Sequence, residues 1–232
     1  ILRTLIVILR FIYFYHIRKK MSFYIDPQKK INDHIYINKK DGLKETVITH
    51  NMRFVDNFFH LDRTYKRFNG SKTMKISYPL KSIDFLNFEK DKVLSVGPRN
   101  EGELFQIRSL GFPWKNIYGI DLLSYSDLIT LGDIHNCKYE DSFFNVILCG
   151  WVLTYSDNYE KILEELLRIV KDKGIISIGF SYNPQKDYSF YSTEQILKKY
   201  EKNISQIFFN FDAYKNDPKN TRQSILIIKI KK

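Results

Sequence analysis

Hydrophobic residues follow two different rhythms along this chain, and the change comes near residue 92. Before it, apolar side chains at three- and four-residue steps predict an amphipathic helix over 44–68, and Ser82 is placed to begin a short helix over 82–90. After it, short β-branched runs alternate with helical patterns. The expected strands cover 93–97, 117–122, 128–133, 145–150, 174–182, 204–210 and 224–230, and the expected helices cover 101–110, 158–171 and 193–201, the last with Thr193 as N-cap.

Strands that alternate with helices indicate an α/β protein, in which a doubly wound, mostly parallel sheet carries helices on both faces. In such sheets ligands bind beyond the carboxyl ends of the strands, where the strand order reverses. The sequence therefore predicts a domain over 92–232 whose chemistry lies in the residues that follow each strand. Residues 21–91 are expected to form a helical cap before it.

The first twenty residues form an apolar and basic extension of uncertain role. Arg3, Arg10 and His16 interrupt the apolar run, so it falls short of the about 18–20 residues that a membrane-spanning helix needs. Three interpretations remain open for residues 1–20. They are sequence upstream of a natural start at Met21, an amphipathic anchor at a membrane surface, or a helix that caps the fold.

Charge and composition narrow the choice of partners only slightly. The chain has 232 residues, and its 37 basic and 26 acidic side chains give a net charge of +11. An excess of this size suits a nucleic acid or an anionic membrane. However, the lysines are spread along the whole chain, and Ala213 is its only alanine, which is typical of an AT-rich coding bias. A basic binding face and a compositional bias are both kept as explanations.

Cysteine usage points away from disulfides and metals. Cys137 and Cys149 are the only cysteines, and no CxxC pair suggests a metal site. A reducing, cytoplasmic setting is the default expectation. Apolar residues make up 44% of the chain and aromatic residues 16%, and this composition excludes wholesale disorder.

Two residues at the first strand ends indicate a nucleotide-like ligand. Gly97 ends the first strand and permits a tight turn with close approach of a ligand to the backbone. Asp121 ends the second strand, 121 − 97 = 24 residues later, which is close to the spacing at which Rossmann-like sites place a carboxylate for a ribose diol. A solvated turn at each position is the alternative.

The next two strand ends add candidates for the rest of such a ligand. Asp133 is placed to accept a hydrogen bond from an exocyclic adenine amine, and Ile134 is placed to pack on the purine. Gly150 again permits close approach, and the ring of Trp151 could lie beside a cationic centre. His135 and Tyr155 are candidates for a general base, with a histidine bonded to the backbone as the alternative for the first.

Four motifs between Val93 and Tyr182 resemble the class I S-adenosylmethionine-dependent methyltransferases, in particular their type 11-like domain. They are VLSVG with its following helix, YGID, YEDSFFNVILCGWVL and RIVKDKG. The resemblance implies a Rossmann-like sheet of seven strands with the last strand antiparallel, and S-adenosylmethionine as the cofactor. It implies cofactor contacts from Gly97, Pro98, Arg99, Glu101, Asp121, Leu122, Asp133, Ile134, Gly150 and Trp151.

The sequence departs from the family pattern in two places. The glycine loop reads GPRNEGE instead of GxGxG, so Arg99 and Glu101 bring bulk near the cofactor, or bond its carboxylate and amino group. Only about six residues separate the second and third strands, so the helix that usually connects them is expected to be short or missing.

Methyl transfer to a small molecule or a glycan or metabolite precursor is the function that this resemblance implies. Two alternatives stay open. One is a nicotinamide-dependent oxidoreductase or epimerase, which would need a glycine loop that cradles a pyrophosphate. The other is a catalytically inactive binding domain, basic enough to touch RNA. The methyl acceptor and the oligomeric state do not follow from the sequence.

Overall fold

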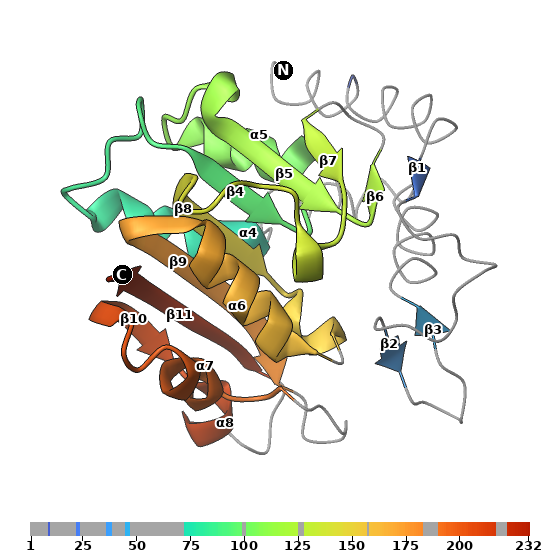
Figure 1. Cartoon of the computed structure of the whole chain (residues 1–232), viewed down its shortest axis with the longest axis vertical. Helices are drawn as coiled ribbons and strands as arrows, with labels where there is room; N and C mark the ends of the chain where they lie inside the picture. The colour runs from blue at the N-terminus through green and yellow to red at the C-terminus, as the bar shows by residue number, and fades with distance from the viewer. Residues whose placement is uncertain are drawn as a thin grey trace.

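The computed structural model places a seven-stranded mixed sheet at the centre of the protein (Figure 1). It describes residues 72–98, 101–124, 128–156, 158–182, 190–216 and 222–232, and before them residue 9 and three short strands. The sheet has the order β10-β11-β9-β8-β4-β5-β7. Its strands are β4 (Val93–Val96), β5 (Ile117–Asp121), β7 (Ile129–Leu131), β8 (Phe144–Gly150), β9 (Val170–Tyr182), β10 (Ile204–Phe211) and β11 (Arg222–Ile230).

The pairing of these strands confirms the predicted fold class. The pairs β4–β5, β4–β8, β5–β7 and β8–β9 are parallel. The last strand, β11, is antiparallel to both of its neighbours, β9 and β10. All four residues of β4 are buried, as are most of those in β8, because helices cover both faces of the sheet there.

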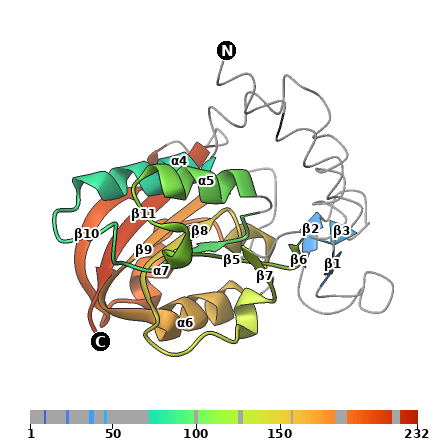
Figure 2. The ribbon, with the colours of Figure 1, turned by 90° about the horizontal axis from the view of Figure 1, so that it is seen from above.

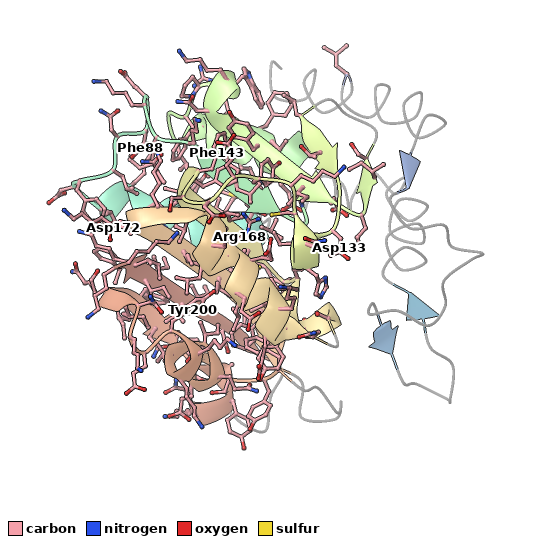
Figure 3. The ribbon with its side chains drawn as sticks, viewed as in Figure 1. Phe88, Asp133, Phe143, Arg168, Asp172 and Tyr200 are labelled. Carbon is pink, nitrogen blue, oxygen red and sulfur yellow. The ribbon has the colours of Figure 1, made fainter. Side chains whose placement is uncertain are left out.

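Two hydrophobic clusters hold the helices against the two faces. On one side lie α4 (Lys72–Ser77), the 3₁₀ helix η4 (Tyr78–Ser82) and α5 (Glu101–Ser109), and on the other lies α6 (Tyr159–Ile169), as Figure 2 shows. The helix α7 (Thr193–Lys199) packs on the same side as α6 through Ile196, next to the buried ring of Tyr200, which Figure 3 labels. A short helix, α8 (Ala213–Asn216), contacts β11.

Helix α6 shows why the helical pattern was readable. Asn158 caps its first turn by accepting a hydrogen bond from the backbone N–H of Lys161, at 3.2 Å. Its apolar residues recur at helical spacing and are buried against the sheet, while Glu160 and Glu164 stay at the surface. Burial of apolar side chains stabilises this packing by about 1.5–3 kcal/mol for each large residue.

Some predicted boundaries are wrong. No helix covers 82–90, where turns follow η4, and the N-cap of α7 is Ser192 instead of Thr193. The strand predicted from residue 174 begins at Val170, because an irregularity in the register lets Val170 pair with Phe144 while Lys173 adopts a positive φ of 61°. Glu45–Thr46, inside the helix predicted over 44–68, is the strand β3, and the remainder of that helix lies outside the described residues.

The connection between β5 and β7 lacks the usual helix among its described residues, as the short spacing predicted. The two-residue strand β6 (Leu123–Ser124) stands there instead and pairs antiparallel with β1 (Ser22–Phe23). A second pair joins β2 (Tyr36–Asn38) to β3. Among the helices that the structure describes, none is both long and apolar enough to span a membrane.

Hydrogen bonds to Asp212 connect the start of α7 to the end of β10. This buried carboxylate accepts hydrogen bonds from the hydroxyl of Ser192 (2.5 Å), from the backbone N–H and hydroxyl of Thr193 (both 2.9 Å) and from the N–H of Tyr214 (2.9 Å). Burial alone would raise the pKa of Asp212, but these donors outweigh it and hold the pKa below its ordinary value.

We expect this carboxylate to make folding sensitive to acid. A depressed pKa in the folded state contributes stability above the unfolded pKa of about 3.9, and that stability is lost as the pH falls through the folded value. Thermal unfolding of the wild type should therefore shift downward below about pH 4. In Asp212→Asn part of this shift should be absent and stability near neutral pH should be lower. An identical acid dependence in both proteins would contradict the assignment.

Candidate active site

Four strand ends meet at one edge of the sheet. The central strand β4 has β5 on one side and β8 on the other, so the strand order reverses beside it. Gly97, Asp121 and Gly150 stand at or just after the carboxyl ends of these three strands, and Asp133 follows β7 at the same edge, where Figure 3 labels it. This is the switch point at which doubly wound sheets bind their ligands.

The turn after β4 requires glycine. Gly97 has a φ of +67°, a conformation that side chains disfavour, and a Cβ added there would come 2.6 Å from Cγ2 of Val152. Its backbone N–H donates a 2.9 Å hydrogen bond to the carbonyl of Ile120. The glycine turn therefore lies directly beside the residue that precedes Asp121, as the sequence analysis expected.

Asp121 connects this turn to the next strand end. It is the last residue of β5 and is 7% exposed. Its backbone carbonyl accepts a 2.9 Å hydrogen bond from the N–H of Gly132. Gly97, Asp121 and the Gly132–Asp133 turn thus form a continuous row along the edge, in which the backbone of Asp121 contacts the residue that precedes Asp133.

Asp133, His135 and Ser156 form a hydrogen-bonded series across two loops. Oδ1 of Asp133 accepts from the backbone N–H of His135 (2.9 Å) and lies 2.6 Å from Nδ1 of its ring. On the far side of the ring, Nε2 lies 2.6 Å from Oγ of Ser156. The turn η6 (Ile134–Asn136) after β7 is thereby joined to the end of η7 (Leu153–Tyr155) after β8.

The end of β8 carries backbone strain. Trp151 has a positive φ of 58°, which is rare for so bulky a residue. Its ring is buried in the hydrophobic cluster beneath α4, and its Nε1 donates a 2.8 Å hydrogen bond to Oγ of Ser181. The ring of Trp151 therefore packs in the core, and these contacts do not require a cationic ligand beside it. Strained residues of this kind gather at functional sites.

Several other predicted positions are placed less directly. Pro98 and Ile134 are buried, and Leu122 is half-buried between β5 and β6. Arg99 lies outside the described residues, and the side chains of Glu101 and Tyr155 are not described. The roles expected for these residues stay predictions.

Neither Cys137 nor Cys149 has an activated thiol. Burial raises the pKa of the Cys149 thiol, which directly precedes Gly150 in β8, to about 12. Burial also raises the pKa of Cys137, which lies 3.5 Å from Oε2 of Glu165. Both are therefore protonated at neutral pH and unsuited to nucleophilic chemistry. Within the described residues no cluster of three or more His, Cys, Asp and Glu side chains could hold a metal ion.

Residues from the beginning of the chain adjoin this edge. The strand β1 pairs with Leu123 and Ser124, immediately after Asp121, and β2 contacts η7. Figure 1 shows β1 beside β6. The described N-terminal strands therefore touch two of the loops that follow the central strands.

Two residues of this region could not be predicted from the sequence. Val152 closes on Gly97, and Ser156 receives His135. The only local signal for the second was the Asp-x-His spacing after β7, which suggests a side-chain contact within the turn but does not identify the serine on another loop.

Comparison with known proteins shows what this region resembles. The sequence model of a methyltransferase domain matches residues 94–178, which run from β4 into β9 and contain every strand end described above. Residues 94–178 are similar to a methyltransferase domain. The resemblance inferred from the motifs is thereby confirmed. A search of curated proteins found no match.

Solved structures share the fold of the methyltransferase domain at low sequence identity. The Haloferax volcanii complex of the Trm112 methyltransferase activator with its methyltransferase partner matches with a TM-score of 0.54 and 14% identity, over 76% of this chain and 97% of that one. A Listeria monocytogenes protein described as an S-adenosylmethionine-dependent methyltransferase matches with a TM-score of 0.53 and 14% identity, over 70% and 99%.

A third structure contains a ligand. The N-methyltransferase NodS from Bradyrhizobium japonicum, in complex with S-adenosylhomocysteine, matches with a TM-score of 0.50 and 11% identity, over 72% of this chain and 87% of that one. These likenesses show that the chain shares the Rossmann-like fold of these structures.

Proposed function

We propose that the protein transfers a methyl group from S-adenosylmethionine to a small-molecule acceptor, with a glycan or metabolite precursor as the class expected. The observation that carries the proposal is the row formed by the Gly97 turn and Asp121 within the methyltransferase domain. S-adenosylmethionine as the cofactor is supported by the family match and by the S-adenosylhomocysteine bound to NodS.

The residues at the strand ends suit the cofactor in kind. Asp121 would accept hydrogen bonds from the two ribose hydroxyls, and Asp133 with Ile134 would hold the adenine. Gly97 and Gly150 would let the methionine part approach the backbone. Because a Cβ at Gly97 would collide with Val152, the turn is shaped for a bare backbone. Arg99 and Glu101 remain candidates for the carboxylate and amino group of the methionine.

S-adenosylmethionine supplies an already activated methyl group on a sulfonium, so the protein mainly needs to align donor and acceptor. A general base is needed only where the acceptor must lose a proton. Both ring nitrogens of His135 are within hydrogen-bond distance of protein partners, which disfavours it as that base. Tyr155 remains the other candidate.

The acceptor is expected to bind where the N-terminal strands adjoin the site. β1 and β2 touch the loops after β5 and β8, so these two strands border the proposed site. Sequence differences in this part would then select the acceptor without altering the cofactor residues.

Calorimetric titration of the full-length protein tests the proposal. S-adenosylmethionine and S-adenosylhomocysteine should bind with micromolar dissociation constants, and NAD should produce no heat, because its pyrophosphate needs a different glycine loop. Absence of binding by both adenosyl ligands at ~1 mM would overturn the proposed function. Binding without transfer of a labelled methyl group to any extract-derived small molecule would favour the inactive binding domain.

A further inference from the structure

The imidazole of His135 joins the loop after β7 to the loop after β8 at the predicted adenine end of the site. We propose that His135 is a positioning residue for adenine recognition, which orients the carboxylate of Asp133 and ties it to Ser156. This inference rests on the proposed function, since it assumes that an adenosyl group binds there. The role belongs to His135 and Ser156, and neither residue is required to touch the cofactor.

The backbone and the ring of His135 both contact the carboxylate of Asp133. Oδ1 of Asp133 accepts two hydrogen bonds from the same residue, one from the backbone N–H of His135 at 2.9 Å and one from Nδ1 at 2.6 Å. The backbone bond alone would let the carboxylate rotate, whereas two donors in different directions fix its plane. With the plane fixed, the position of the second oxygen, Oδ2, is also set.

The hydroxyl of Ser156 holds the imidazole of His135 from its other side. Nε2 lies 2.6 Å from Oγ of Ser156, and this oxygen also accepts a 3.0 Å hydrogen bond from the backbone N–H of Asn158. A serine hydroxyl has one proton and two lone pairs, so Oγ can accept from Asn158 and still form its bond with Nε2. Because a carboxylate only accepts, Nδ1 carries a proton and donates it to Oδ1 of Asp133, and the ring thereby joins Asp133 to Ser156.

Burial makes these bonds effective. The side chain of His135 is 15% exposed and that of Asp133 is 21% exposed, while Ser156 is 8% exposed. Hydrogen bonds to a charged group in such surroundings are stronger than those at the open surface. The imidazole therefore acts as a rigid spacer between two loops that both border the site.

The same residue types in the same order build the nucleophilic triads of acyl-transfer enzymes. The surroundings of Ser156 argue against that role, because its hydroxyl is buried and already accepts from Asn158. A nucleophile must present its oxygen to a substrate. The geometry thus favours positioning over covalent catalysis, and the experiment below includes an outcome for each.

The test compares two ligands that differ at one edge of the base. These are S-adenosylhomocysteine and S-inosylhomocysteine, in which a carbonyl oxygen replaces the adenine amine and N1 carries a hydrogen. If Asp133 accepts from the amine, the wild-type protein should prefer the adenosyl ligand by ~10–100-fold. The preference, expressed as the ratio of the two dissociation constants, reports on the orientation of Asp133 and is insensitive to a general loss of affinity.

Three substitutions separate the two bonds of the ring. His135→Asn places an amide nitrogen near the position of Nδ1, so it should keep the bond to Asp133 and retain most of the preference. His135→Gln reaches only the position of Nε2, and His135→Phe keeps the ring volume without a donor. For each of these two variants that is folded, the ratio of the two dissociation constants should fall to within ~3-fold of unity. Asn136→Ala, an exposed neighbour in the same turn, is the matched control and should behave as the wild type.

The outcomes distinguish this inference from the proposed function. If the wild type binds neither ligand, the proposed function fails. If it binds both but His135→Gln and His135→Phe keep the wild-type ratio, or weaken both ligands equally, His135 has a structural role only and the inference is overturned. Labelling of Ser156 by a serine-directed fluorophosphonate would also overturn it, in favour of the nucleophilic triad.

Discussion

Replacement of Asp121 by alanine is expected to abolish detectable binding of S-adenosylhomocysteine, with a loss of about 100-fold or more in affinity. Asp121 ends β5 beside the Gly97 turn, and under the proposed function its carboxylate would accept hydrogen bonds from both ribose hydroxyls. Charge-assisted hydrogen bonds contribute about 1.5–3 kcal/mol each, so the loss of two accounts for an effect of this size. Calorimetric titration of wild type and variant with the same ligand measures it.

Two further variants make the Asp121 result interpretable. Asp121→Asn preserves the side-chain volume and one acceptor, and should lose about 10-fold, because the remaining bonds lack the charge. Asp84→Ala removes an exposed carboxylate between η4 and β4 and should bind as the wild type. Thermal unfolding of each protein shows whether it is folded under the conditions of titration. Undiminished binding by a folded Asp121→Ala would discard the site.

The strands and the main helices were predictable because their signals are local. Each parallel strand of the sheet centre is a short apolar run, such as VLSV in β4, that is buried on both faces and bounded by polar or glycine residues. Helix α6 repeats apolar residues at helical spacing, and its buried face lies where that pattern placed it. The fold class follows from the alternation of such elements.

The helix predicted over 82–90 failed because side chains compete with the helical backbone. Oδ1 of Asn87 accepts from the backbone N–H groups of Glu89 and Lys90, and the N–H of Asn87 donates to a carboxylate oxygen of Asp91. These short-range bonds stabilise turns at the expense of helical hydrogen bonds. Ser82 as a possible N-cap was therefore a weaker guide than the turn-forming Asn87 five residues later.

The site was predictable only as far as the strands align it. Parallel strands bring their carboxyl ends to one edge, so Gly97, Asp121 and Asp133 could be expected near one another from position alone. The bond between His135 and Ser156 could not, because it joins residues 21 positions apart on two loops that have no periodic pattern. The packing of Trp151 beneath α4 also depends on tertiary contacts that no local spacing encodes.

Replacement of Gly97 by alanine is expected to destabilise the protein by about 2–4 kcal/mol and to lower its Tm by roughly 5–15 °C. Two independent penalties combine in this value. The positive φ of 67° costs about 1–2 kcal/mol for a residue with a Cβ, and the new methyl group would come 2.6 Å from Cγ2 of Val152. Thermal and denaturant unfolding of the full-length protein measure the sum.

A double-mutant cycle with Val152→Ala separates the two penalties. The single change Val152→Ala should cost about 1–2 kcal/mol, since the side chain is half-buried. In the double variant the collision disappears while the backbone strain remains, so the combined cost should be smaller than the sum of the single costs by about 1–3 kcal/mol. Strictly additive costs would show that Val152 does not enclose the turn. Because relief of the collision restores packing but not the bare backbone, the double variant should still bind S-adenosylhomocysteine more weakly than Val152→Ala alone.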